Sequence, residues 1–398
     1  MRALSGKSGM WVAGAVLALV FVGSTLPTSL YDFYQSELHF SEITLTLIYS
    51  AYVAGTLLTL LFVGRISDQI GRRPAALAGL ALAAASMLVF VAKIAIAVLF
   101  VARFLTGLAV GLAAGAATAW IAELDPRKNV EHSTSVAVGS NLFGLALGPL
   151  LSGLLAQLAP WPLRLSHLVF LVALLPMAFA VAKVRETVKQ SDHRASEISL
   201  RPRIGVPQES RARFFAPALT GFGIFALGGF YAALTPGLLR GPLRQTNRAV
   251  VGLVIFEFFT AGAAAIALTP RMRSKASMLA GLALLVPSLA LVVMSGMVRS
   301  LPLVVVATAL GGVALAFGYR GSLEVVNQIA PDDRRAEIVS TYLLFCYTGT
   351  SLPVIGVGIV SQLVSAPIAH IAFAITIALF ALGALLASRA IKPVATAG

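Results

Sequence analysis

The stretch GRISDQIGRRP, residues Gly64 to Pro74, separates two long apolar runs, Leu45–Val63 and Ala75–Ala92. Its two glycines allow a sharp turn, because glycine adopts backbone conformations that strain residues carrying a Cβ atom. Three arginines in so short a loop mark that side of a membrane as cytoplasmic. Asp68 precedes Arg72 by four residues, so the two side chains can pair on one face of a helical turn. The stretch therefore predicts a cytoplasmic loop between two membrane spans.

The composition of the whole chain is that of an integral membrane protein. Of its 398 residues 58% are hydrophobic and 12% are charged, with a mean hydropathy of +0.89, whereas a soluble domain carries about 25% charged residues. The net charge of +14 lies mainly between the apolar runs, which argues against a nucleic-acid partner. The single Cys346 excludes a disulfide within the chain, and the five histidines show no metal-ligand spacing. No phosphate-binding loop or nucleophile elbow is present, so we expect no enzymatic activity.

Runs of about 20 apolar residues are long enough to cross a bilayer, and the chain contains twelve. The predicted spans are Met10–Tyr34, Ser41–Val63, Pro74–Ala92, Ala95–Ile121, Ser133–Leu158, Leu165–Ala182, Phe214–Leu239, Ala249–Leu268, Ser277–Met297, Pro302–Ile329, Ala336–Leu363 and Ile368–Ser388. The first run is interpreted as a retained helix and not as a signal peptide, since no small-x-small cleavage site follows it.

A polar segment rich in Arg, Ser, Glu and Pro divides the chain near its middle. We therefore expect a six-helix bundle over residues 1–182, a cytoplasmic linker over 183–213 and a second six-helix bundle over 214–398. Twenty-two of the thirty Lys and Arg residues fall in segments that are cytoplasmic if both termini are, against six in the opposite segments. This bias predicts cytoplasmic termini, although the cluster Arg240–Arg248 argues weakly against it.

The two halves of the chain repeat. Gly107 aligns with Gly312 at an offset of 205 residues, and Pro149 aligns with Pro353 at an offset of 204. Parallel six-helix repeats are typical of facilitator-type transporters, whose substrate site lies near the membrane midplane between the halves. The predicted fold is an all-α membrane protein with twelve transmembrane helices in two pseudo-symmetric six-helix bundles.

The spacing G-x-x-x-D-x-x-G-R-R that begins at Gly64 resembles the signature loop of the major facilitator superfamily, which joins helices two and three. Gln69 stands where that family usually carries a basic residue. In the family pattern, an acid at the end of helix four holds this loop through its arginines. Glu123 fits that role, and Asp125 is an equally near candidate. The cytoplasmic gating loop implied by the resemblance comprises Gly64, Asp68, Gly71, Arg72, Arg73 and Glu123.

Two further stretches resemble superfamily motifs. Arg103 begins a pattern R-x-x-x-G-x-x-x-G in span four, and the resemblance links this arginine to proton transfer; the alternative is an arginine that extends to the outer surface. The glycines of the pattern, at positions 107, 111 and 115, predict a smooth face for helix packing. Span five contains a stretch that is similar to the antiporter motif of drug exporters, with Ser152 in place of one glycine. The motif residues are Gly144, Gly148, Pro149 and Gly153.

Few acids fall inside the predicted spans. Glu257 is central in span eight, Glu324 follows Arg320 by four residues in span ten, and Asp32 lies near the outer end of span one. Charges within a membrane are costly and usually functional, and desolvation favours the neutral form of an acid, which suits proton exchange. The candidates for proton coupling are Asp32, Arg103, Glu257, Arg320 and Glu324. The alternatives are a neutralised structural pair for Arg320 with Glu324, an interfacial acid in water for Asp32, and a permanently protonated acid hydrogen-bonded to a neighbouring helix for Glu257.

The resemblance implies a secondary active transporter, which we expect to be a proton-coupled antiporter exporting a small organic molecule, drug or metabolite, by alternating access. A proton symporter that imports a metabolite and a transport-inactive membrane sensor remain alternatives. We expect the proton as coupling ion, no cofactor or metal, and as partners the small-molecule substrate, protons and the lipid bilayer, with the protein a monomer in the bacterial inner membrane. Candidate residues of the substrate cavity are Tyr31, Tyr34, Asn141, Tyr231 and Tyr319.

The predicted topology can be tested by cysteine labelling. With Cys346 replaced by Ser, single cysteines at Ser5, Ser191 and Thr396 should resist an impermeant thiol reagent applied outside intact cells, because all three positions are predicted to be cytoplasmic. Permeabilised cells provide the control for thiol reactivity. Labelling of any of the three in intact cells would contradict the topology.

Overall fold

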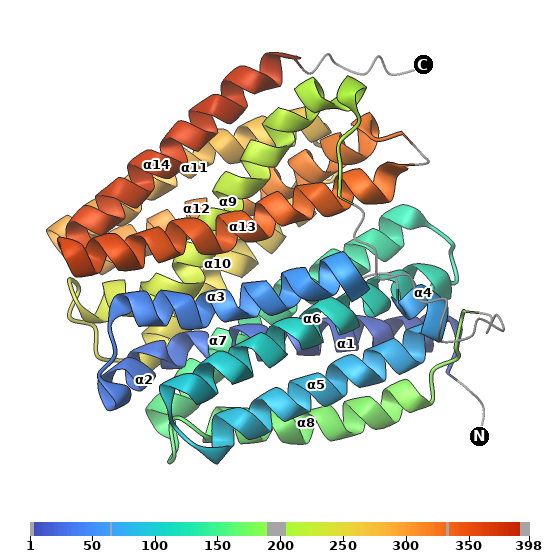
Figure 1. Ribbon diagram of the computed structural model, residues 1–398, viewed down its shortest axis with the longest axis horizontal. Helices are drawn as coiled ribbons and strands as arrows, with labels where there is room; N and C mark the ends of the chain where they lie inside the picture. Colours follow the sequence, from blue (N-terminus) through green and yellow to red (C-terminus); the bar gives the residue numbers. More distant parts are fainter. Residues whose placement is uncertain (1–3, 64–65, 189–203, 332–333, 391–398) are drawn as a thin grey trace. The chain divides into compact units, whose positions relative to one another are not determined.

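The computed structural model describes residues 4–63, 66–188, 204–331 and 334–390, and the regular elements there are helices (Figure 1). The α-helices are α1 (Gly6–Thr25), α2 (Tyr31–Leu38), α3 (Glu42–Leu58), α4 (Ile66–Ile70), α5 (Arg72–Ala92), α6 (Ile96–Leu124), α7 (Val130–Leu158), α8 (Leu165–Ala182), α9 (Gln208–Arg240), α10 (Arg248–Leu268), α11 (Ser274–Val298), α12 (Leu301–Ile329), α13 (Arg335–Leu363) and α14 (Ala366–Ala387). A π-helical turn, Thr59–Val63, follows α3. Gly64 of the predicted gating loop and residues 189–203 of the linker lie outside the described residues.

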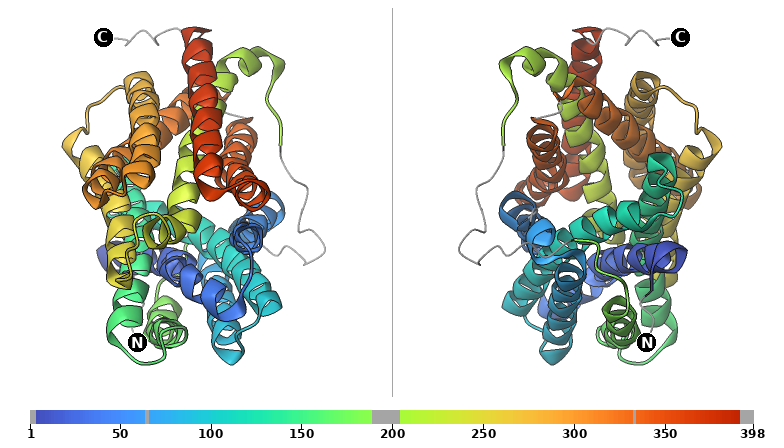
Figure 2. Two further views of the ribbon diagram at one scale, coloured as in Figure 1. Left: turned by 90° about the vertical axis from the view of Figure 1, so that its left-hand side faces the viewer. Right: turned by 90° about the vertical axis from the view of Figure 1, so that its right-hand side faces the viewer.

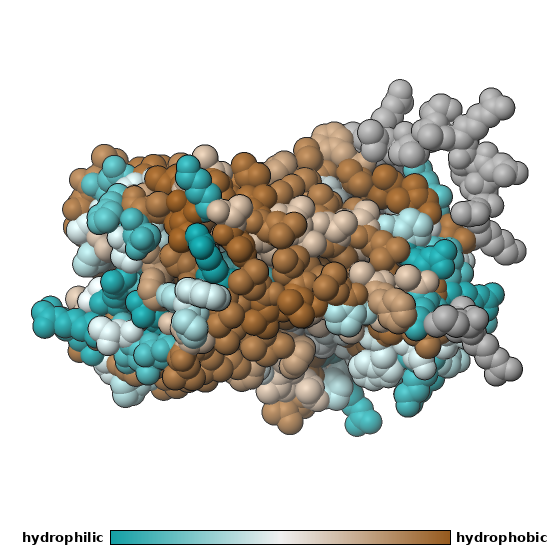
Figure 3. Space-filling view, turned by 90° about the horizontal axis from the view of Figure 1, so that it is seen from below, coloured by the Kyte–Doolittle hydropathy of each residue, from teal (hydrophilic) through white to brown (hydrophobic). Residues whose placement is uncertain are grey.

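The twelve predicted spans are confirmed. Within the described ranges, twelve helices are long and apolar enough to cross a membrane. Their ends differ from the prediction by a few residues, most at Gln208–Arg240, where the helix begins with a polar turn that precedes the apolar run. Figure 3 shows a belt of hydrophobic side chains, with hydrophilic side chains gathered toward its two ends. This pattern fits helices whose middles lie in hydrocarbon and whose ends reach water.

The chain forms two compact units. Unit 1 comprises Met1–Phe40, Leu47–Pro202 and Asn247–Phe256, and unit 2 comprises Ser41–Thr46, Arg203–Thr246 and Glu257–Gly398. In unit 1, α1 packs on α6 and α7, and α5 packs on α6 and α8 (Figure 2). In unit 2, α9 packs on α12, α13 and α14, and α11 packs on α12. The predicted limits of the two bundles and the linker stay a prediction.

Glycines bring α3 and α6 into direct backbone contact. A Cβ atom at Gly107 would overlap the carbonyl oxygen of Tyr52 and would lie 2.8 Å from the Thr56 nitrogen and 3.0 Å from Gly55 Cα. The Thr56 hydroxyl donates a hydrogen bond to the Gly107 carbonyl oxygen at 3.3 Å. Gly111 continues this contact, since its Cβ would lie 2.5 Å from Thr59. Such close crossings let dispersion forces hold helices together in lipid, where no hydrophobic drive acts between them.

The predicted glycine face of span four ends before Gly115. No atom lies within 4 Å of the position that a Cβ would take at Gly115, and the residue is exposed. The spacing of the three glycines is equal, so the sequence alone could not separate them.

The difference between the crowded Gly107 and the open Gly115 can be tested with the same substitution at each position. Gly107→Leu should destabilise the protein by about 1–3 kcal/mol, because the added side chain forces two backbones apart. Gly115→Leu, on the same helix and in open space, should leave thermal unfolding of the purified protein in detergent nearly unchanged. Equal losses of thermal stability in the two variants would contradict the packing described for Gly107.

Candidate functional site

Arg72, the first residue of α5, holds the loop that precedes it. Its Nη1 lies 2.5 Å from Asp68 Oδ1 and donates to Ser67 Oγ at 2.7 Å. Its Nη2 and Nε donate to Glu123 Oε1 at 2.7 and 3.1 Å. The Arg72 side chain is only 9% exposed, and burying a charge is costly unless it is paired and hydrogen-bonded. The predicted pair of Asp68 with Arg72 is thus formed, together with a forked contact to Glu123.

Of the two acids at the end of α6, Glu123 is the one that reaches Arg72. Asp125 follows the helix with extended backbone, and its carboxylate accepts the Arg127 N–H at 3.0 Å and lies 3.0 Å from His132 Nδ1. Burial would raise the pKa of Asp125, but the hydrogen bond from His132 and those from backbone N–H groups outweigh it and lower the pKa. The Asp125 carboxylate therefore binds groups within the turn between α6 and α7. The gating role of Glu123 stays a prediction.

Arg103 lies in the interior of unit 1 with 1% of its surface exposed. Its Nη1 donates to the Ser24 carbonyl oxygen at 2.6 Å, and its Cζ lies 5.9, 5.6 and 4.7 Å from the ring centroids of Tyr31, Tyr49 and Tyr52. Contacts with aromatic faces offset part of the cost of burying the charge. The alternative in which Arg103 extends to the outer surface is wrong in this structure, since such an arginine would place its guanidinium in water.

The antiporter-type residues of α7 lie against α1. A Cβ at Gly148 would lie 2.6 Å from the Val22 carbonyl oxygen, and a Cβ at Gly144 would overlap the carbonyl oxygen of Ala18. Pro149 lacks the N–H that an ordinary helical residue donates four residues back. Its own carbonyl accepts a hydrogen bond from Ser29 Oγ at 2.8 Å, which ties this part of α7 to the turn after α1. The tight packing predicted for this motif is confirmed.

The close contacts of these α7 glycines form a seam along the helix. Gly153, the last glycine of the motif, extends this seam to α10. A Cβ at Gly153 would lie 2.8 Å from the Arg248 carbonyl oxygen and 3.2 Å from Gly252 Cα. Gly252 in turn approaches the carbonyl oxygen of Pro149, and the Arg248 N–H donates to Gln157 Oε1 at 3.0 Å. The first turns of α10 therefore touch α7 through backbone atoms.

Arg320 of α12 binds the segment that follows α10. Its guanidinium donates to the carbonyl oxygens of Thr269 and Pro270 at 3.0 and 2.8 Å, and its Nε donates to Glu324 at 3.0 Å. Carbonyl groups at the end of a helix have no partner within the helix, and a cation is favourable there. The geometry favours the structural interpretation of the Arg320–Glu324 pair, and its role in coupling stays a prediction.

The remaining candidates are mostly packed within their own unit. Glu257 is half-buried in α10, next to Phe258, whose ring stacks on Tyr231 at 4.3 Å. Tyr31, Tyr34 and Tyr231 are buried, and Tyr319 meets Phe225 edge-on at 5.2 Å. Asp32 and Asn141 are half-buried in α2 and α7. Whether these side chains line a substrate cavity stays a prediction.

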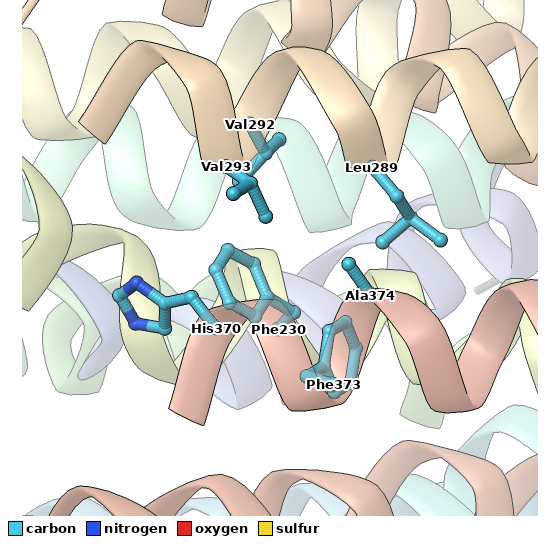
Figure 4. A pocket seen from close by; sticks show the side chains of 7 residues that line it. All are labelled: Phe230, Leu289, Val292, Val293, His370, Phe373 and Ala374. Carbon is cyan, nitrogen blue, oxygen red and sulfur yellow. The ribbon is translucent and has the colours of Figure 1, made fainter. Parts of the chain in front are cut away.

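An apolar pocket in unit 2 lies between α9, α11 and α14 (Figure 4). It is lined by Phe230, Leu289, Val292, Val293, His370, Phe373 and Ala374. The side chains fill it so closely that no water-sized molecule fits. The His370 ring lies 5.3 Å from that of Phe230, edge-on. This pocket belongs to the packed core and is not a substrate site in this structure.

Several partners in these clusters were not predicted. Tyr49 and Tyr52 stand three residues apart and so share a face of α3, a pattern that could have been read beside the unpaired Arg103. Glu186, described below, contacts Arg72 across 114 residues of chain. No pattern among neighbouring residues of the sequence predicts a contact over that separation.

Comparison with known proteins identifies the family. The model of the Major Facilitator Superfamily matches residues 12–264. The chain belongs to this superfamily. It is 28% identical to multidrug resistance protein MdtL of Shewanella oneidensis over 211 residues, 52% of each chain, and 29% identical to multidrug resistance protein D of Escherichia coli over 147 residues, 37% of each. The chain spans about half the length, or less, of these curated relatives.

Solved structures of the superfamily confirm the fold. A bacterial homologue of the human lysosomal transporter Spinster superposes with a TM-score of 0.76 at 12% identity, covering 97% of this chain and 98% of that one. The protein is therefore an integral membrane protein with the twelve-helix major facilitator fold, and both curated relatives are named as multidrug resistance proteins.

The Asp68–Arg72 pair can be tested directly. Asp68→Asn should abolish turnover while leaving membrane insertion and ligand binding largely intact. The Asp68 side chain is 50% exposed, and exposed ion pairs contribute about 0–1 kcal/mol, so the effect should be kinetic. Transport by reconstituted protein measures it, with Glu37→Gln, an exposed acid of α2, as control. Wild-type transport rates in the Asn variant would refute a gating role for Asp68.

Proposed function

We propose that this superfamily member is a proton-coupled antiporter that exports a small amphipathic organic molecule by alternating access. The observation that carries the proposal is the seam along α7. Gly144 and Gly148 set its backbone against α1, and Gly153 sets it against the first turns of α10. The same residues resemble the antiporter motif of drug exporters, and the curated relatives named above are multidrug resistance proteins.

Close backbone packing suits an exchanger for a physical reason. Within hydrocarbon, a continuous water-filled gap between helices gives ions and protons a path across unless an electrostatic barrier excludes them. Helices that touch through glycines leave no such gap, so protons would cross only through groups that bind them. The hydrogen bond from Ser29 to the Pro149 carbonyl oxygen keeps the seam in one register.

Glu257 is the proposed proton carrier. It is half-buried near the middle of a membrane-spanning helix, where an ionised acid is costly. A neutral form in a dry site and an ionised form beside water or an organic cation would alternate as the cavity opens and closes. Arg103, buried in unit 1, is the second proposed coupling residue.

The loop around Arg72 is the proposed gate. Arg72 is held by a forked contact with Glu123, whose side chain is 33% exposed, and by a contact with Asp68, whose side chain is 50% exposed. The exposed contact can break in water at little cost, whereas the forked contact with Glu123 keeps the arginine in place. We further propose that the protein resides in the bacterial inner membrane as a monomer, with both termini cytoplasmic and with no cofactor.

Transport assays separate this function from its alternatives. Ethidium, an amphipathic organic cation, is the probe, because a cation complements an ionised Glu257. Proteoliposomes should accumulate ethidium when an imposed pH gradient drives protons in the opposite direction. Accumulation along with the proton flux would indicate a symporter. Binding by thermal shift without counterflow would indicate a sensor.

The role of Glu257 predicts an uncoupled variant. Glu257→Gln should preserve ethidium exchange without a pH gradient but lose accumulation against one, because the amide cannot carry a proton. Glu324→Gln is the matched control, since its amide oxygen can still accept from Arg320, which also binds two carbonyl groups. Full gradient-driven accumulation by purified Glu257→Gln would refute the assignment.

A further inference from the structure

The chain that leaves α8 folds back over unit 1 as a short strap, Val184–Val188. The Leu4 N–H donates to the Lys183 carbonyl oxygen and the Arg185 N–H donates to the Leu4 carbonyl oxygen, both at 2.8 Å. The indole N–H of Trp120, a buried residue of α6, donates to the Arg185 carbonyl oxygen at 3.1 Å. The start of the linker is therefore attached to unit 1 before it reaches the gating loop.

The Glu186 carboxylate of the strap binds the amino end of α5. It accepts the N–H of Arg72 at 3.0 Å and that of Arg73 at 2.9 Å, as well as the N–H groups of Thr187 and Val188 at 2.9 and 3.1 Å. The first N–H groups of a helix have no partner within it, and negative charge is favourable there. α5 has no acid in its own first turn and no capping side chain at Gly71. Glu186, which is distant in the sequence, supplies both the negative charge and the capping side chain.

Gly71 makes this approach possible. A Cβ at Gly71 would lie 2.6 Å from Glu186 Oε2, and the residue has φ +104°, which L side chains rarely adopt. The second glycine of the signature stretch is thus required both by the turn and by the carboxylate that lies against it.

The strap also reaches Arg72 by a second route. The Thr187 hydroxyl donates to Glu123 Oε2, and Glu123 binds the Arg72 guanidinium. Arg72 is accordingly held at its backbone by Glu186 and at its side chain by Glu123, and the two acids are joined through adjacent residues of the strap. Asp68 contacts the Arg72 guanidinium but takes no part in these contacts among Glu186, Thr187 and Glu123.

The strap is an anchor at neutral pH and not a switch. Burial would raise the pKa of Glu186, but the four backbone N–H donors outweigh it and lower the pKa. Its partners at Arg72 and Arg73 are backbone N–H groups, and the nearby charged acid is Glu123, which is joined to the strap through Thr187. A carboxyl with a lowered pKa stabilises the fold above the usual glutamate range and loses that effect only as the pH falls through the lowered value.

We propose that Glu186 is a positioning residue of the transport cycle: it fixes the amino end of α5 so that Arg72 stays on Glu123 while its contact with Asp68 opens and closes. This inference rests on the proposed transport function. A loose α5 terminus would let Arg72 leave Glu123, and the gate would then close in several geometries instead of one. The consequence is a slower cycle with unchanged substrate affinity.

The test uses Glu186→Gln, Glu186→Asp and the control Glu209→Gln, an exposed acid in the first turn of α9. An amide has one acceptor oxygen and cannot replace a carboxylate that receives two helix N–H groups. In the Gln variant, hydrogen exchange at the Arg72 and Arg73 amides should accelerate by at least about tenfold, the effect of losing a hydrogen bond to a charged group. The maximal rate of ethidium exchange should fall about as much, with the dissociation constant for ethidium unchanged and with partial recovery in the Asp variant.

Two results would overturn the proposal. Unchanged amide exchange in Glu186→Gln would show that the carboxylate does not hold α5. Accelerated amide exchange with a wild-type rate of ethidium exchange would show that the anchor has no part in the cycle. Absence of ethidium exchange in the wild-type protein is a different failure, because it overturns the proposed transport function and the cycle role of Glu186 together.

Discussion

The hydrocarbon core of a bilayer offers no hydrogen-bond partners, and the structure depends on this constraint. Backbone groups must be satisfied within each segment, so the spans are helices, and the helices are held by close contact because lipid is as apolar as their side chains. The contacts at Gly55 with Gly107 and at Gly148 with Val22 are the result. Helix ends are the places where unpaired N–H and carbonyl groups remain, and the charged clusters around Arg72 and Arg320 lie there.

Both units place a charged side chain at the end of a helix, but the two charges have opposite signs. In unit 1 a carboxylate, Glu186, lies on the N–H groups that begin α5. In unit 2 a guanidinium, Arg320, lies on the carbonyl groups that follow the end of α10. Each charge complements the helix dipole at its position, and each fastens a connection between the second and third helices of its half. The halves of the repeat thus retain a fastening at corresponding connections while the chemistry of that fastening differs.

Arg103 and Arg72 illustrate two ways of keeping a charge within a membrane protein. Arg103 is enclosed by three tyrosine rings and a carbonyl group, which suits a permanent charge in the interior. Arg72 is bound by two acids of unequal exposure, so one contact can be released into water while the other persists. The proposed gate depends on this inequality, since the more exposed contact with Asp68 opens at less cost than the forked contact with Glu123.

The sequence by itself determined the spans, the loop between the second and third spans, and the pairing of Asp68 with Arg72, because these depend on apolar length and on helical spacing over a few residues. It left Glu123 and Asp125 equivalent, gave Gly107 and Gly115 the same weight, carried no sign of Glu186, and did not show that Tyr31, Tyr49 and Tyr52 surround Arg103. Those outcomes were decided by the tertiary structure. Arg72 meets Glu123 across 51 residues, Arg103 meets Ser24 across 79, and Arg72 meets Glu186 across 114. Local spacing fixes where a helix forms and which side chains share its face, but only the packing of helices determines which faces meet.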